Sequence, residues 1–276
     1  MRFPSLLVLS VLATICAGPP SSAAPKPAGH VGVSYVAPKH PELRPIHDAM
    51  RSKRVLERVA SVVGELRLPR RLTLKLDECG GEPNAWYDPE KRAVTLCYEY
   101  LRDIADRAPS DRSPEGVTRQ EALVGPVFQV LLHETGHAIF DLLDVPILGR
   151  EEDAADQVAA FAILRLGPKE AREVIDGSAY LFVSYAREEK PEKDAYADVH
   201  GLSAQRFYNL VCLAYGSDPK AFGYVVEKSY LPKDRAEGCG EEYDQVAYAF
   251  QRLIGPSLRS RTAAVRRLRR ELGQRR

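Results

Sequence analysis

The chain has 276 residues, of which 45% are hydrophobic and 28% are charged, and its formal net charge at pH 7 is +1. This composition supplies ample apolar material for one domain or for two closely packed lobes. Because the charge is nearly balanced, it excludes any whole-protein argument for nucleic acid or membrane binding, and we expect neither nucleic acid nor stable membrane insertion. The composition carries no information on oligomeric state.

Residues 1–24 have the pattern of a secretory signal peptide. A short basic start precedes an apolar run from Leu6 to Ala17 that is too short to span a bilayer, and small residues at 21–24 offer a cleavage site. The alternatives are a lipoprotein signal that ends at Cys16 and an uncleaved anchor. We therefore expect the mature protein to be secreted or periplasmic.

The mature chain is predicted to begin with a Pro-rich linker or extended arm over residues 25–45, because this segment lacks hydrophobic periodicity. Apolar residues then recur at helical spacing over 46–66, and residues 72–76 alternate as in a strand. We place one domain at 46–256, with an α/β lobe at about 46–166 and a helical lobe at about 167–256.

A hairpin is predicted over residues 79–97. Two strand-like runs flank the turn at Asp88 and Pro89, and Trp86 lies in the first run. One alternative for this segment is a plain hairpin closed by a disulfide, with Trp86 in the core. A helix at 98–108 and a loop at 109–114 follow.

Four cysteines remain after the predicted signal peptide, an even number that favours disulfides in an oxidising compartment. Of the three possible pairings we prefer Cys79 with Cys97 and Cys212 with Cys239, because each pair brackets a local segment. A cysteine-based zinc site is the weaker alternative, since neither spacing resembles C-x-x-C.

The most informative motif is His133-Glu134-Thr135-Gly136-His137, set in an apolar helix that runs to residue 144. Histidines four residues apart lie on one helical face, so both rings can bind one metal ion while Glu134 reaches a water bound there. Zinc accepts neutral imidazole and leaves a position open for water, so we expect one Zn²⁺ per chain. The alternative is a pair of buried histidines with structural hydrogen bonds only.

A second helix, from residue 150 to before 167, supplies the candidate third ligand. Glu152 and Asp156 are four residues apart and share one face. We assign Glu152 as the third metal ligand and Asp156 as the acceptor that orients a ligand histidine through its free N–H. Glu151 and Asp153 are lesser candidates, and acidic residues in a first helical turn are also ordinary partners of the helix dipole.

The rest of the chain is predicted to be mostly helical. The expected helices cover residues 169–175, 179–186, 203–215, 221–228 and 243–254, and a charged flexible loop covers 188–194. Residues 257–276 form a basic tail, which could hold an anionic surface, although a solvated terminus is the preferred explanation.

The histidine motif with the downstream Glu152 and Asp156 resembles the gluzincin pattern of zinc peptidases. Over about residues 68–254, with the stretches 148–156 and 205–209 carrying the likeness, the chain is similar to a family of secreted bacterial metallopeptidases classed as a domain of unknown function. The resemblance implies an α+β, zincin-like fold with a small sheet or hairpin and mainly helical catalytic and C-terminal parts.

The same resemblance implies further site residues. Asn84, Ala85 and Trp86 are similar to the Asn-Ala-aromatic edge strand that binds substrate over the zinc in thermolysin-like enzymes. His200 stands where gluzincins carry a donor to the oxyanion, with Arg206 and Tyr208 behind it as substrate-binding candidates. A lone histidine at a helix start is, alternatively, a cap-region residue.

These features predict an exported zinc metallopeptidase that hydrolyses peptide bonds of a peptide or protein substrate. Glu134 would act as the general base towards the attacking water, and His200 would stabilise the oxyanion. The alternatives are a catalytically silent secreted binding protein on a peptidase scaffold and a zinc amidase that acts on cell-wall amides.

Overall fold

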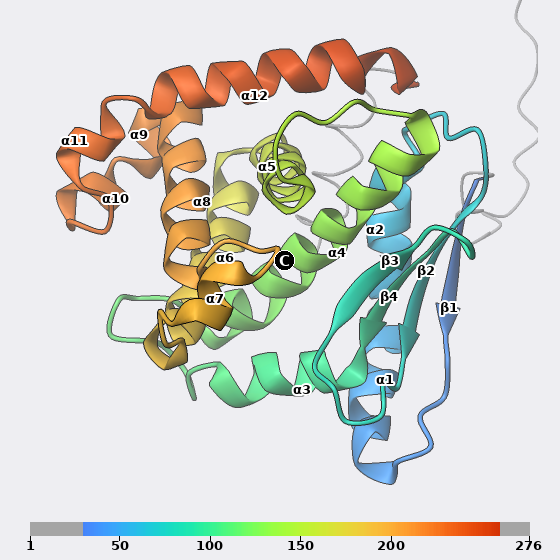
Figure 1. The fold of residues 1–276 in the computed structure, drawn as a ribbon. Helices are drawn as coiled ribbons and strands as arrows, with labels where there is room; N and C mark the ends of the chain where they lie inside the picture. The colour runs from blue at the N-terminus through green and yellow to red at the C-terminus, as the bar shows by residue number, and fades with distance from the viewer. Residues whose placement is uncertain (1–29, 260–276) are drawn as a thin grey trace, which may run out of the picture.

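The computed structural model describes residues 30–259, so the predicted signal peptide and most of the basic tail lie outside the described residues. A small sheet lies on one side of the molecule and most of the helices on the other, with one long helix, α4 (Arg119–Leu143), running between them (Figure 1). Buried apolar residues from the sheet and from the helices form one continuous cluster. The α+β prediction of a small sheet with a mainly helical remainder is confirmed.

The sheet has four strands in the order β1 (Val31–Tyr35), β2 (Leu72–Asp77), β4 (Ala93–Cys97), β3 (Ala85–Asp88). The first three strands are parallel, and β3 pairs antiparallel with β4 at the edge. Side chains alternate between the two faces of a sheet, and the inner face carries fully buried residues. These are Leu72, Leu74, Leu76, Val94 and Leu96. The strand predicted at 72–76 and the hairpin at 79–97 are confirmed.

Strand β1 lies inside the segment that we expected to be a linker or extended arm. Val31 pairs with Leu72 and Tyr35 with Leu76, and Val31 is buried. The backbone is extended, but it belongs to the sheet and does not link separate parts. A single edge strand of five residues, one of them glycine, is too short to show clear periodicity.

The helices other than α4 follow in chain order. They are η1 (Pro41–Leu43), α1 (Arg44–Ser52), α2 (Val55–Val63), α3 (Tyr98–Arg107), α5 (Glu151–Leu164), α6 (Pro168–Glu188), α7 (Lys193–Ala197), α8 (Ser203–Ser217), α9 (Pro219–Phe222), α10 (Tyr224–Glu227), α11 (Lys233–Ala236), α12 (Cys239–Leu253) and η2 (Gly255–Ser257).

Two of the predicted helices are interrupted. The helix expected at 46–66 is α1 and α2, which break at Arg54, a residue in the left-handed conformation with φ 52°. The helix expected at 221–228 is α9 and α10, which meet at Gly223. Within residues 30–259, no helix is long and apolar enough to cross a membrane.

Helix α4 is fixed at its start and along its flank. Thr118 and Glu121 form a capping box, in which each side chain accepts a hydrogen bond from the other residue's backbone N–H. Helix α6 crosses α4 closely, since a Cβ atom on Gly177 would lie 1.9 Å from the carbonyl oxygen of Glu121. We expected two helices at 169–175 and 179–186, and this is wrong: Gly177 lies inside one helix because the crossing requires a residue without a side chain.

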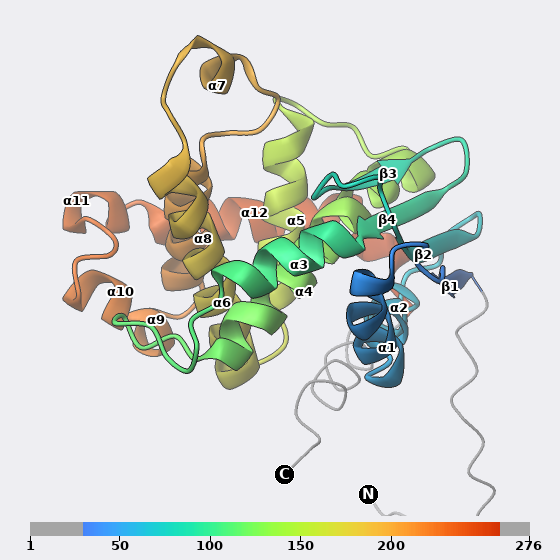
Figure 2. The same cartoon turned by 90° about the horizontal axis from the view of Figure 1, so that it is seen from below.

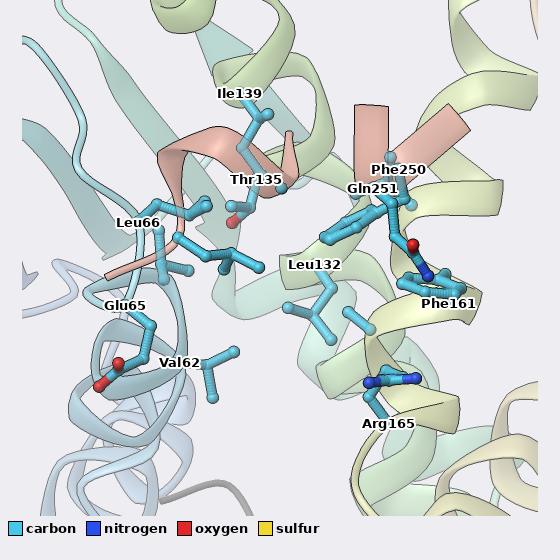
Figure 3. A pocket seen from close by; sticks show the side chains of 15 residues that line it. Val62, Glu65, Leu66, Leu132, Thr135, Ile139, Phe161, Arg165, Phe250 and Gln251 are labelled. Atoms are coloured by element: carbon cyan, nitrogen blue, oxygen red, sulfur yellow. The ribbon is translucent and has the colours of Figure 1, made fainter. Parts of the chain in front are cut away.

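An apolar cavity of about 200 Å³ lies behind α4, on the side that faces α2, α5 and α12. Figure 3 shows Leu132 and Ile139 of α4 at its wall, with Phe161 and Phe250 opposite. The Thr135 hydroxyl donates to the carbonyl of Leu131, so this polar group in the wall is satisfied within its own helix.

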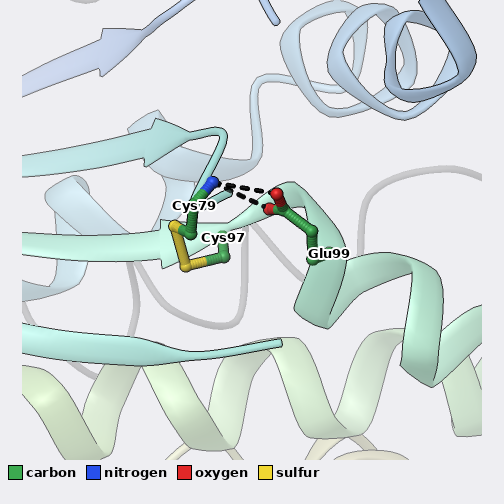
Figure 4. A group of neighbouring side chains, drawn as sticks. All are labelled: Cys79, Cys97 and Glu99. Atoms are coloured by element: carbon green, nitrogen blue, oxygen red, sulfur yellow. Dashed lines mark hydrogen bonds between the residues drawn. A yellow bond between two sulfur atoms is a disulfide. The ribbon is translucent and has the colours of Figure 1, made fainter. Parts of the chain in front are cut away.

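The two disulfides join Cys79 to Cys97 and Cys212 to Cys239, which is the preferred pairing. The first closes the hairpin, and the buried Glu99 supports it (Figure 4). The Glu99 carboxylate accepts hydrogen bonds from the backbone N–H groups of Cys79, at 2.9 and 3.1 Å, and of Gly81, at 3.0 Å. The second disulfide ties α8 to α12.

Candidate metal centre

The two histidines of the H-E-x-x-H motif lie one turn apart on α4 and point to the same place. Their Nε2 atoms are 3.3 Å apart, and their ring centroids are 5.0 Å apart. His133 is almost fully buried and His137 is mostly buried. One face of α4 therefore presents two imidazole nitrogens to a single point.

Helix α5 brings Glu152 to that point. Glu152 Oε2 lies 3.0 Å from His133 Nε2 and 3.3 Å from His137 Nε2. The two helices can approach this closely because their contact residues are small: a Cβ atom on Gly136 would lie only 3.1 Å from the Cα atom of Ala155. The helix–turn–helix therefore brings together the two histidines and the carboxylate that the sequence suggested.

The outer nitrogens of both rings also face carboxylates. His133 Nδ1 lies 2.8 Å from Asp156 Oδ1, and His137 Nδ1 lies 2.8 Å from Glu151 Oε1. A carboxylate accepts, so each Nδ1 carries the hydrogen, and a neutral ring then has its lone pair on Nε2. When both rings are neutral, two nitrogen lone pairs and one carboxylate oxygen meet within 3.3 Å of one another. A bound metal ion would make this meeting favourable, and without a metal ion a proton on His133 Nε2, donated to Glu152, does so.

The three donor atoms fit zinc. In a tetrahedral site with ligands about 2.0–2.1 Å from Zn²⁺, neighbouring ligand atoms are about 3.3–3.4 Å apart. The observed separations are 3.0, 3.3 and 3.3 Å. Two imidazoles and one carboxylate are also the ligand types of catalytic zinc sites, which keep a fourth position for water.

Asp156 is held in turn by two other side chains. Arg206 of α8 donates to both of its oxygens, at 2.7 and 2.8 Å, and Gln129 Nε2 donates to Oδ1 at 3.0 Å. The guanidinium also lies over the ring of Phe182, 4.7 Å from its centroid. The orientation of His133 is therefore set by a chain of contacts that reaches from α4 through α5 to α8.

These contacts shift the proton affinities of the site. Burial alone would lower the pKa of His133, but hydrogen bonds to Asp156 and Glu152 outweigh it and raise this pKa to about 9. Hydrogen bonds from His133, His137 and His200 lower the pKa of Glu152 far below its usual range. Glu152 is therefore an anion at any ordinary pH, as a metal ligand must be.

Glu134 lies beside the ligands on α4 and is only 7% exposed. Burial raises the pKa of its carboxyl above the ordinary value, and the neighbouring histidines oppose this effect. A carboxyl group with a raised pKa takes up a proton more readily near neutral pH. Glu134 thus has the environment of a group that accepts and returns a proton.

His200 reaches the site from the arm between α6 and α8, residues 189–202, which projects from the body beside α5 (Figure 2). Its Nε2 lies 2.9 Å from Glu152 Oε2, its ring stacks on His133 at 5.9 Å, and its side chain is 40% exposed. Asp198 Oδ1 accepts from the backbone N–H of His200 at 2.8 Å and lies 3.2 Å from its Nδ1. His200 is therefore in contact with the candidate ligand Glu152 and with solvent.

Strand β3 lies at the edge of the sheet and against α4, but its residues point in different directions. The Tyr87 hydroxyl donates to Asp141 of α4 at 2.6 Å, so Ala85 and Tyr87 face that helix. Trp86 faces the outer side of the sheet and is 39% exposed. The interpretation of Trp86 as a core residue is therefore wrong, because it lies on the face that no helix covers.

Of the remaining substrate candidates, Asn84 lies beside β3, whereas Arg206 and Tyr208 line one cleft on α8. The Asn84 side chain accepts a hydrogen bond from the backbone N–H of Ala85 at 2.8 Å. Arg206 is engaged with Asp156, and Tyr208 is exposed at the edge of a shallow cleft between α8 and α11. No contact brings Tyr208 to the metal ligands within the described residues.

Some residues of the site were missed by the sequence analysis. Glu151 was weighed only as a metal ligand, whereas it contacts the outer nitrogen of His137. Gln129 was not considered, although it precedes His133 by four residues and therefore shares its helical face. Asp198 carries no signal beyond its position two residues before His200.

Comparison with known proteins also points to a metallopeptidase family. A family model described as "Putative metallopeptidase" (DUF4344) matches residues 35–254. The searches of curated proteins and of solved structures gave no match. The family match spans most of the chain and includes every residue of the metal centre, so this protein belongs to the DUF4344 metallopeptidase family.

Proposed function

We propose that this protein is a zinc-dependent peptidase that hydrolyses peptide bonds with Glu134 as its general base. The observation that carries the proposal is the meeting of His133 Nε2, His137 Nε2 and Glu152 Oε2 within 3.3 Å, with both outer nitrogens turned to carboxylates. His133, His137 and Glu152 would hold the ion. A bound zinc would acidify a water molecule and polarise the substrate carbonyl.

Glu134 then carries out the two proton transfers of the reaction. The Glu134 carboxylate accepts a proton from the water as it attacks the carbonyl, and returns that proton to the departing amine. Its burial beside the ligands supports this role, because a carboxyl with a raised pKa can hold the proton between the two transfers. Asp156 and Glu151 hold the rings of His133 and His137 in place.

His200 is our proposed donor to the oxyanion. Its Nε2 already lies at the metal-binding carboxylate, and Asp198 close to Nδ1 favours a ring that donates from both nitrogens. Hydrogen bonds that the His200 ring donates to Glu152 and Asp198 also raise the pKa of His200. A donor placed where negative charge develops stabilises the transition state more than the ground state.

The peptide substrate is proposed to pair with the free edge of β3. Cys97 donates from its backbone N–H to the carbonyl of Asn84, so Asn84 and Trp86 use their backbone groups towards β4. The backbone groups of Ala85 and Tyr87 therefore point to the free edge. An extended peptide can add to such an edge by main-chain hydrogen bonds.

The two disulfides favour an oxidising, extracytoplasmic location. Together with the predicted signal peptide, they support a secreted or periplasmic enzyme. Peptide or protein substrates would then be those that the enzyme meets outside the cytoplasm.

The test is the Glu134→Gln variant, measured against an unfolded protein substrate with zinc content followed in parallel. Zinc content should stay at the parental level while kcat/KM falls about 10²–10⁴-fold, since the amide cannot accept the proton. Glu173→Gln, at an exposed position of α6, is the matched control and should keep full activity. A Glu134→Gln enzyme with parental activity would remove the general base from the proposal.

The same assay separates the alternatives. A binding protein on a peptidase scaffold, with or without bound zinc, would cleave neither an unfolded protein nor cell-wall fragments. An amidase would cleave only the cell-wall fragments. The peptidase proposal requires cleavage of the unfolded protein.

A further inference from the structure

The loop before α4 and helices α6, α8 and α10 come together away from the metal centre (Figure 2). Residues from these elements line a cleft of about 490 Å³. This volume lies within the usual range of small-molecule sites, about 300–1,000 Å³. None of the residues that contact the metal ligands lines it. The cleft therefore has no part in the proposed peptide hydrolysis.

The walls of the cleft are apolar and aromatic. One stripe of α6 forms the floor, and α8 and α10 form the sides. The main wall residues are Val183, Phe207, Val211, Tyr224, Val225 and Tyr230. Such a lining favours an apolar or aromatic body, since it removes apolar surface from water.

Charged residues stand at the rim, and positive charge is in excess. Four of the lining residues are cationic, and two are acidic. Arg172 Nε lies 3.5 Å from an oxygen of Asp176, and an Arg187 nitrogen lies 3.5 Å from an oxygen of Glu115. Each acid is therefore matched by one arginine, and two cations remain.

The two remaining cations are Arg112 and Lys228. Arg112 donates to the carbonyl of Gly116, and Lys228 Nζ lies 6.0 Å from the centroid of the Tyr230 ring. Among residues 30–259 neither cation is paired with a carboxylate, and both are exposed at the cleft. An anion bound beside Arg112 and Lys228 would neutralise their positive charges.

We propose that this cleft binds a single-chain amphiphilic anion, with the apolar chain between α6, α8 and α10 and the anionic head at Arg112 and Lys228. The apolar walls account for the chain, and the surplus positive charge selects an anion over a cation or a neutral amphiphile of the same length. The proposal does not depend on peptidase activity, and its tests use no substrate.

Isothermal titration calorimetry with dodecanoate, below its critical micelle concentration, tests the proposal on the full-length protein. Dodecanoate should bind at one saturable site per chain. Dodecyltrimethylammonium and a neutral dodecyl glycoside should bind at least about tenfold more weakly, because they cannot form the charge-assisted contacts. Equal affinity for the three amphiphiles, or the absence of saturable dodecanoate binding, would overturn the proposal.

Two variants locate the site. The exposed double change Arg112→Gln with Lys228→Gln should raise the Kd for dodecanoate at least about tenfold. The control makes the same change in charge at two exposed positions, Arg51→Gln in α1 with Lys53→Gln just after it, and should leave the Kd within about twofold. If both double variants bind dodecanoate like the parent, or if both lose affinity equally, the site is not this cleft.

Discussion

The crossing of α4 and α6 gives the sharpest structural prediction, because it involves backbone atoms that cannot rotate away. A Cβ atom added at Gly177 would lie 1.9 Å from the carbonyl oxygen of Glu121 and 3.2 Å from the Cα atom of Gly125. An ordinary contact begins at 3.4 Å, so the two helices would have to separate by about 3.4 − 1.9 = 1.5 Å at this point. Gly177→Ala therefore displaces the helix that carries both metal-binding histidines.

The magnitude follows from overpacking. Adding a methyl group to a well-packed contact costs about 1–3 kcal/mol, and occasionally more, so we take about 4 kcal/mol for a clash with rigid backbone. Alanine favours a helix over glycine by about 1 kcal/mol, which leaves a net loss of about 3 kcal/mol. For a chain of this length the melting temperature should fall by roughly 6–12 °C.

The assay is thermal unfolding followed by far-UV circular dichroism, with Gly240→Ala as the matched control. Gly240 also lies inside a helix, α12, but a Cβ atom there would meet nothing within 4 Å. That variant should gain up to about 1 kcal/mol from helix propensity. A Gly177→Ala protein that melts at or above the parental temperature would refute the close crossing.

Three further predictions concern the metal centre and the disulfides. Arg206→Lys should raise the zinc Kd about tenfold, measured in competition with a chromogenic chelator, because lysine cannot hold both oxygens of Asp156. The control is Arg150→Lys, which alters a similar pair with the exposed Asp153 and should leave the zinc Kd unchanged. Zinc binding at pH 7 should release protons, seen as a buffer-dependent calorimetric enthalpy, because the two carboxylates beside His133 outweigh burial and raise its pKa to about 9 in the metal-free protein. The apparent zinc Kd should accordingly rise as the pH falls below 9, and a constant Kd would contradict this. Replacing Cys79 and Cys97 by serine opens a loop with a sequence separation of 18 and should cost about 3 kcal/mol in urea unfolding, whereas unchanged stability would show that the bridge contributes nothing.

The cluster of His133, His137 and Glu152 could be predicted from the sequence because it depends on local spacing. Two histidines four residues apart, and an acidic pair four residues apart on the next helix, share faces whatever the rest of the fold does. The short connection between α4 and α5 then leaves few ways to pack the two helices. The small residues Gly136 and Ala155 mark the point of closest approach.

Features that depend on distant contacts could not be found in this way. Gly177 normally indicates a helix end, and only the position of Glu121 on another helix explains why it lies inside α6. Strand β1 is recognisable only through its partner β2. The left-handed Arg54 has no local cause in its side chain, so the break between α1 and α2 was not predicted.

Orientation was a second feature that the sequence left open. The sequence placed Trp86 on a strand but did not decide its face, because a strand of four residues alternates without showing which side is covered. Tyr87, the next residue, makes the contact with α4 through Asp141. The sequence assigned no partner to the outer nitrogen of His137, because Glu151 and Glu152 are adjacent and only the turn of α5 decides which one faces that ring.

The central claim is a zinc ion held by His133, His137 and Glu152, and metal content per folded chain tests it most directly. Zinc should be measured by mass spectrometry in the purified mature protein, in His133→Ala and in His47→Ala, a buried histidine that packs against Tyr98 instead. We predict about one zinc per chain in the parent and in His47→Ala, and almost none in a folded His133→Ala. A folded parent that refuses added zinc, or a His133→Ala variant that retains it, would contradict the account.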